Sequence, residues 1–92
     1  MIDEAKLHQD AARGQRAQAL KDDPILSEAF KTLEAAYIQK WAGTEAPEMQ
    51  AREHYWRAIQ ILGDVRKHLA SVAANGKVAQ KQLDQLGGLN RL

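Results

Sequence analysis

The chain has 92 residues, a formal net charge of +1 and no cysteine. This length allows one domain with a small core, which association with another chain would complete. The lack of cysteine excludes disulfides and thiolate metal sites, and the near-neutral charge argues against a strongly basic nucleic-acid binder. We find neither a signal peptide nor an apolar run of about 18 residues, so no membrane partner is predicted.

Alanine accounts for much of the 45% hydrophobic content, with sixteen residues. Alanine favours helix but contributes little burial, so the composition predicts an all-α protein without a thick core. Charge is distributed unevenly along the chain. Residues 21–54 carry four bases and seven acids, whereas residues 66–92 carry five bases and one acid.

The first expected element is a weak N-terminal helix over residues 2–20. Its thin apolar stripe consists of Ile2, Leu7, Ala11, Ala17 and Leu20. Gly14 lowers the helical propensity of its middle by about 1 kcal/mol relative to alanine. The segment either forms this flanking helix or is partly disordered until it docks.

The second expected element, over residues 24–43, has clear ends. Asp23 is a good N-cap, and Pro24 suits the first helical position because its missing N–H is not needed there. Gly43 ends the helix. After a short turn, in which Thr44 or Ala46 caps the next helix, a second long helix is predicted over residues 47–75.

Apolar residues recur at steps of three and four in both long helices, which indicates an antiparallel helical hairpin within a single domain over residues 1–92. We expect Asp22, Asp23 and Glu28 to face Arg66 and Lys67 at the open end of this hairpin. The predicted hairpin core is Leu26, Phe30, Leu33, Tyr37, Trp41, Tyr55, Trp56, Ile59, Leu62 and Val65.

Asn75-Gly76 resembles a helix stop, because glycine adopts the left-handed conformation easily. A short helix over residues 77–86 and a mobile tail over residues 87–92 are expected after it. The second helix of the hairpin is longer than the first, so the apolar residues at its end must pack against something else, either a flanking helix or another subunit. The candidate interface for a homo-oligomer is Leu69, Val72, Val78 and Leu83.

The sequence predicts no catalytic, cofactor or metal site. His8, His54 and His68 lie on separate segments, and no histidine–glutamate metal motif or glycine-rich phosphate loop is present. The five arginines Arg13, Arg16, Arg52, Arg57 and Arg66 do not reproduce the motifs of the helical chorismate mutases, which are enzymes of similar length. We therefore predict a protein that is not an enzyme.

Two groups of side chains have both a structural and a binding interpretation. Tyr37, Trp41, Tyr55 and Trp56 cluster near the turn, where they form core or, if some face outward, a hot spot for a partner. The candidate phosphate contacts are Arg66, Lys67, Lys77 and Lys81. Solvated helix faces are the simpler interpretation of these bases, because no aromatic residues are interleaved with them.

Several motifs together resemble a group of short proteins of tailed phages and prophages. The resemblance covers roughly residues 12–86 and rests on Asp23-Pro24-Ile25-Leu26, Trp41-Ala42-Gly43-Thr44, Arg52-Glu53, Leu62-Gly63-Asp64-Val65-Arg66-Lys67-His68-Leu69 and Gly76-Lys77. Genes of this group generally lie among head-assembly and DNA-packaging genes. The resemblance implies a role in virion assembly, in the host cytoplasm or the virion, and it brings no catalytic residues.

Three functions follow as expectations. The first is head assembly or genome packaging through protein–protein contacts, with self-association and phage structural or packaging proteins as partners. The second is DNA binding linked to packaging, as in a small terminase subunit, through the basic C-terminal part. The third is a small regulatory protein that sequesters a host factor.

Overall fold

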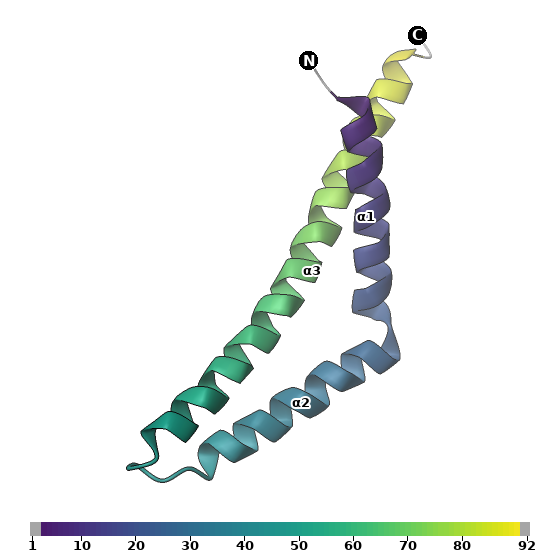
Figure 1. Cartoon of the computed structure of the whole chain (residues 1–92). Helices are drawn as coiled ribbons and strands as arrows, with labels where there is room; N and C mark the ends of the chain where they lie inside the picture. The colour runs from purple at the N-terminus through teal and green to yellow at the C-terminus, as the bar shows by residue number, and fades with distance from the viewer. Residues whose placement is uncertain (1–2, 91–92) are drawn as a thin grey trace. The chain divides into compact units, whose positions relative to one another are not determined.

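The computed structural model describes residues 3–90, which form three α-helices and no strand (Figure 1). Helix α1 spans Glu4–Asp22, α2 spans Pro24–Ala42 and α3 spans Met49–Asn90. The prediction of an all-α protein is confirmed. The finer prediction, a hairpin followed by a short separate helix, is not confirmed, because a single helix occupies the C-terminal part.

The chain divides into two compact units that share α3. Unit 1 combines α1 with the part of α3 that begins at His68, and unit 2 is the contiguous segment Asp23–Lys67, with α2 and the first part of α3. Because α3 continues through both units, this division does not decide whether they fold as one domain. The single domain over residues 1–92 stays a prediction.

The start of α2 is as the sequence predicts. Asp23 is the N-cap, and its carboxylate accepts a hydrogen bond from the backbone N–H of Leu26 at 2.9 Å. Pro24 follows in the first turn, where helix N–H groups have no partner within the helix. Only Asp23 separates α1 from α2, so this cap also fixes where one helix stops and the next begins.

Asp23→Ala is expected to lower the free energy of unfolding by about 1 kcal/mol, because one amide of the first turn loses its partner. For a domain of this size, that corresponds to a fall of about 4–8 °C in the melting temperature. Thermal unfolding followed by circular dichroism measures it. Asp22→Ala is the matched control, since Asp22 only accepts an exposed side-chain hydrogen bond from Gln18. Equal losses in the two variants would contradict the capping role.

The turn between α2 and α3 differs in detail from the prediction. Gly43 is the C-cap of α2, as expected. Thr44 also caps α2, because its hydroxyl donates to the Trp41 carbonyl at 2.7 Å, so it does not start the next helix. The first backbone hydrogen bond of α3 runs from the Arg52 N–H to the Glu48 carbonyl, and α3 begins at Met49, not at residue 47.

The predicted breaks at Gly76 and at Gly87-Gly88 are wrong. Both lie inside α3, and no glycine in the described chain has a positive φ. Gly76 serves as a contact point for α1 instead of as a helix stop. The expected helix over residues 77–86 is therefore part of α3, and so is the expected tail as far as Asn90, while residues 91–92 lie outside the described residues. No contact explains why the helix continues through Gly87-Gly88, where nothing lies within 4 Å of an added Cβ.

Unit 1 is held together by small residues. Figure 1 shows α1 beside the last part of α3, with the chain running in opposite directions. A Cβ added at Gly14 would lie 2.4 Å from the Cα of Gly76, so the two backbones are in direct contact. Counting three residues outward from this contact pairs Ala11 with Ala79 and Ala17 with Ala73. These six residues, the small-residue seam, are the buried positions of unit 1.

Unit 2 packs larger side chains but buries none of them fully. No residue between Asp23 and Lys67 falls in the buried class. Of the predicted core, Leu33, Trp56 and Val65 are exposed, because helical spacing places them beside the contact line between α2 and α3 and not on it. The other predicted core residues are half-buried: Leu26, Phe30, Tyr37, Trp41, Tyr55, Ile59 and Leu62.

The predicted ion pairing at the open end is also different. Arg66 pairs with Glu34 at 3.1 Å, and its guanidinium lies 5.2 Å from the centre of the Phe30 ring. The late start of α3 shifts the register, so Arg66 meets α2 two to three turns from Asp23. Both charged side chains are more than a third exposed, so the pair sets register and contributes little stability.

Candidate functional site

Aromatic side chains from α2 and α3 meet near the turn of unit 2. The rings of Tyr37 and Tyr55 have centroids 6.3 Å apart, and so do those of Trp41 and Trp56. The interplanar angles of 37° and 41° are tilted arrangements, which aromatic pairs favour over a face-to-face sandwich. The ammonium of Lys40 lies 5.9 Å from both tyrosine centroids. The structure thus brings together the four aromatic residues that the sequence singles out.

Arg52 fastens the turn to α3. Its guanidinium lies 5.2 Å from the centre of the Trp41 ring. One of its Nη atoms donates to the Thr44 carbonyl at 3.3 Å and to the Thr44 hydroxyl at 3.0 Å. The only local sequence signal for this role is the position of Arg52, one turn before Tyr55 on the same side of the helix.

An open hollow lies beside these contacts of Arg52. It is lined by Trp41, Ala46, Met49, Arg52, Glu53 and Trp56. Met49 is 75% exposed and Trp56 is 51% exposed, although both are large apolar side chains. Trp41, by contrast, is half-buried, so of the two tryptophans one faces inward and the other outward, which is the condition under which the cluster serves both as core and as a binding surface. Exposed tryptophan and methionine next to a fixed arginine are typical of protein-binding surfaces.

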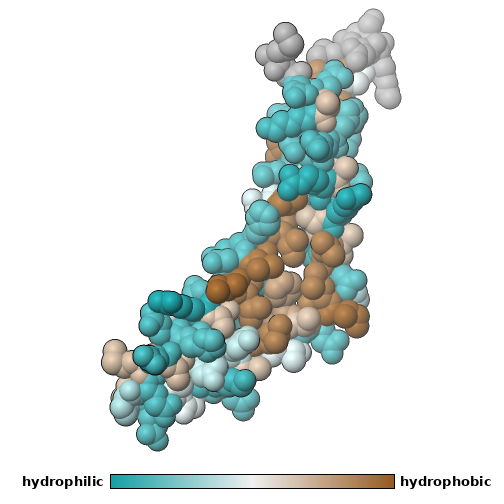
Figure 2. Space-filling model, in the orientation of Figure 1, coloured by the Kyte–Doolittle hydropathy of each residue, from teal (hydrophilic) through white to brown (hydrophobic). Residues whose placement is uncertain are grey.

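A second apolar region, the lateral face, consists of Ile25, Leu33, Ile61 and Val65. Their exposed fractions are 73%, 46%, 60% and 44%. Helical spacing places Ile25 and Leu33 on one side of α2, and Ile61 and Val65 on one side of α3. The two helices are antiparallel, because Trp41 contacts Trp56 whereas Phe30, earlier in α2, contacts Arg66, later in α3. In this arrangement both pairs of residues lie on the same face of unit 2. Figure 2 shows apolar side chains gathered on one face over α2 and α3.

The chain matches no protein-family model, and neither a curated protein nor a solved structure is significantly similar to it.

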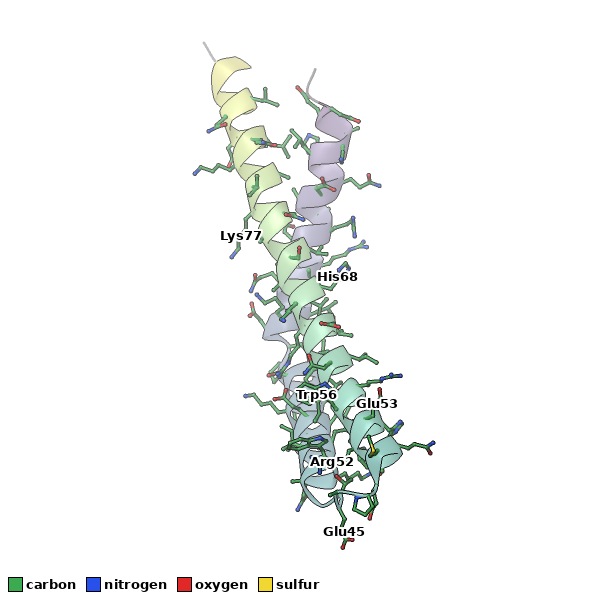
Figure 3. The ribbon with its side chains drawn as sticks, turned by 90° about the vertical axis from the view of Figure 1, so that its left-hand side faces the viewer. Glu45, Arg52, Glu53, Trp56, His68 and Lys77 are labelled. Carbon is green, nitrogen blue, oxygen red and sulfur yellow. The ribbon has the colours of Figure 1, made fainter. Side chains whose placement is uncertain are left out.

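The predicted interface residues divide into two kinds. Leu69, Val72 and Leu83 are half-buried in unit 1, where α1 packs against this part of α3. The predicted free end of the longer arm is therefore partly covered by the N-terminal helix. Val78 remains 57% exposed. A small polar hollow beside the small-residue seam is lined by Asp10, Arg13, His68, Ser71, Val72 and Asn75, and His68 is labelled in Figure 3.

The four candidate phosphate contacts are divided between the two units. Arg66 is engaged by Glu34 and Phe30 in unit 2. Lys67 is exposed in unit 2, whereas Lys77 and Lys81 are exposed in unit 1. Among the described residues, no group of three metal-ligating side chains lies together. None of the described helices is long and apolar enough to cross a membrane.

Proposed function

We propose that the protein acts by binding other proteins, as a homo-oligomer, in the assembly of the head or the packaging of the genome of a tailed phage. The observation that carries the protein-binding part is the unfinished core of unit 2. Every large apolar side chain in this unit keeps some exposure, and those of the lateral face keep almost half or more. The assembly setting rests on the resemblance of the sequence motifs to proteins encoded among phage head genes.

Burial of the lateral face supports self-association on energetic grounds. Apolar surface removed from water contributes about 25 cal/mol per Å². The monomer forgoes this contribution at four large side chains on one face, and contiguous exposed patches of this kind mark interaction sites. The charge of unit 2 does not oppose a second copy, because residues 23–67 carry six bases and seven acids.

Analytical ultracentrifugation at tens of micromolar tests this proposal. We expect an oligomer for the natural chain, and a monomer with unchanged helical content for Ile61→Asp, which places a charge in the lateral face. Gln60→Asp is the matched control, because it adds the same charge to the neighbouring exposed residue outside that face. A sharp monomer of the natural chain would contradict self-association.

Two further measurements test the two alternative functions, DNA binding and sequestration of a host factor. Retention on DNA at low salt, with affinity that falls steeply as salt is added, would favour the packaging-linked DNA binder. Specific capture of one host protein by a natural chain that is itself monomeric would favour the regulatory function. Arg66 is paired with Glu34, so it would have to leave that pair to contact a phosphate, which gives the DNA-binding hypothesis less support.

A further inference from the structure

The turn end of unit 2 combines exposed apolar side chains with acidic ones. We call Trp41, Met49 and Trp56, together with Glu45, Glu48 and Glu53, the turn surface. Its apolar part is the hollow described above, in which Met49 and Trp56 are exposed. The three glutamates are exposed as well, and Figure 3 shows Glu45 at the tip of the turn. Glu53 lines the hollow, and Glu45 and Glu48 directly adjoin the lining residues Ala46 and Met49 in the chain, so this surface fits an apolar side chain that basic residues accompany.

Two of these acids have no partner of their own. Arg52 lies within the hollow, but its guanidinium is committed to Thr44 and Trp41. Glu53 forms an ion pair with Arg57. Within residues 3–90, the side chains of Glu45 and Glu48 make no hydrogen bond and no ion pair. Thr44 and Trp41 are neutral, so Arg52 keeps its positive charge. Three glutamates against Arg52 and Arg57 still leave a formal net charge of −1 next to the exposed apolar side chains.

The complementary arrangement lies on the last part of α3. Val78 is 57% exposed and is flanked by Lys77 and Lys81, both of them exposed. Lys77 and Lys81 are one turn apart, so they lie on the same side of the helix as each other and next to Val78. Neither lysine forms an ion pair within the described part of the chain. We call Lys77, Val78 and Lys81 the basic segment, and Figure 3 shows Lys77 pointing away from α3.

We propose that the basic segment of one copy docks on the turn surface of the next copy. Val78 packs against Trp56 and Met49, while Lys77 and Lys81 lie near Glu45 and Glu48. The two surfaces are different patches of the chain, so the contact is head-to-tail and generates a ring or a filament, and not an isolated two-fold dimer. The inference rests on the proposed self-association and adds a second, head-to-tail contact to the one through the lateral face.

Charge reversal on each surface tests the proposal by sedimentation velocity. Glu45→Lys with Glu48→Lys gives a chain in which both surfaces are basic, and Lys77→Glu with Lys81→Glu gives one in which both are acidic. For each double variant alone, we expect the apparent dissociation constant to rise at least about tenfold, because like charges then meet at the contact. An equimolar mixture is expected to assemble again, since every contact between the two variants joins opposite charges. A two-fold contact through the lateral face predicts no such recovery.

Two controls keep the result specific. Glu28→Lys with Asp64→Lys changes the net charge as much as the turn variant does, at exposed positions outside the turn surface. It should assemble like the natural chain. Lys77→Arg with Lys81→Arg should also assemble. Circular dichroism should show the same helical content in every variant, because all the changed side chains are exposed.

The outcomes separate this inference from the proposed function. Recovery in the mixture supports the head-to-tail contact. If both double variants assemble like the natural chain, or if the mixture assembles no better than either variant alone, the head-to-tail contact is overturned, while loss of assembly in Ile61→Asp would still support self-association. A natural chain that is monomeric at every concentration overturns both.

Discussion

Gly76→Ala is expected to destabilise the protein, although alanine is the better helix former. The exchange by itself gains up to about 1 kcal/mol of helical propensity. The new Cβ, however, would lie 2.4 Å from the Cα of Gly14, and this neighbour is backbone that cannot rotate away. The two helices must separate, which costs about 1–3 kcal/mol for an overpacked site and also opens the small-residue seam.

We therefore expect a lower melting temperature for Gly76→Ala in thermal unfolding. Gly63→Ala is the matched control on the same helix, because nothing lies within 4 Å of a Cβ added there. That exchange should raise stability by up to about 1 kcal/mol, from propensity alone. Equal stability of the two alanine variants would show that α1 and α3 do not approach as closely as the structure has them.

The second large effect is expected from Leu62→Asp in unit 2. Leu62 is half-buried on the side of α3 that faces α2, so the exchange removes apolar packing and places an unpaired carboxylate between the two helices. Truncating a buried leucine costs about 2–5 kcal/mol, and partial burial reduces this loss while the charge adds to it. A loss of about 3 kcal/mol lowers the melting temperature by more than 10 °C for a chain of this size.

Ile61→Asp is the matched comparison for this prediction, because it places the same charge one residue earlier at a side chain that is 60% exposed. The two variants should differ in kind. Leu62→Asp should lose stability at every protein concentration. Ile61→Asp should differ from the natural chain only at concentrations where that chain self-associates, since association stabilises the folded state by mass action. Unchanged helical content and melting temperature in Leu62→Asp would show that Leu62 does not face α2.

The ends of α2 were predictable because their signals are local. The Asp23 carboxylate reaches an amide only three residues away, and Gly43 follows directly after the helix. The continuation of α3 was not predictable in this way. Asn75-Gly76 carries the local signature of a stop, but Gly76 is held in the helix opposite Gly14, which is distant in sequence. Tertiary contact overrides local propensity here.

At the candidate surfaces, too, local features were predictable and features that depend on contacts distant in sequence were not. The aromatic cluster followed from helical spacing on either side of one short turn, and its four residues do meet. The small-residue seam went unnoticed because Ala11, Gly14 and Ala17 read as a weak helix when large apolar residues are counted. The sequence signal for the seam was a small residue at every third position in both helices, in α1 and again in α3. Val65 was assigned to the core because it is apolar, but it lies beside the α3 residues that face α2 and is exposed.

The discontinuous make-up of unit 1 has a consequence for the order of folding. Unit 2 is one uninterrupted stretch, whereas unit 1 needs Gly14 and Gly76 to meet across the whole of unit 2. Closing a flexible loop of about 60 residues carries an entropy cost that grows with the logarithm of its length. Once α2 and the first part of α3 have paired, most of that loop is already ordered. The contact between the chain's two ends should therefore form late in folding and be the first to open, because its formation depends on structure made elsewhere.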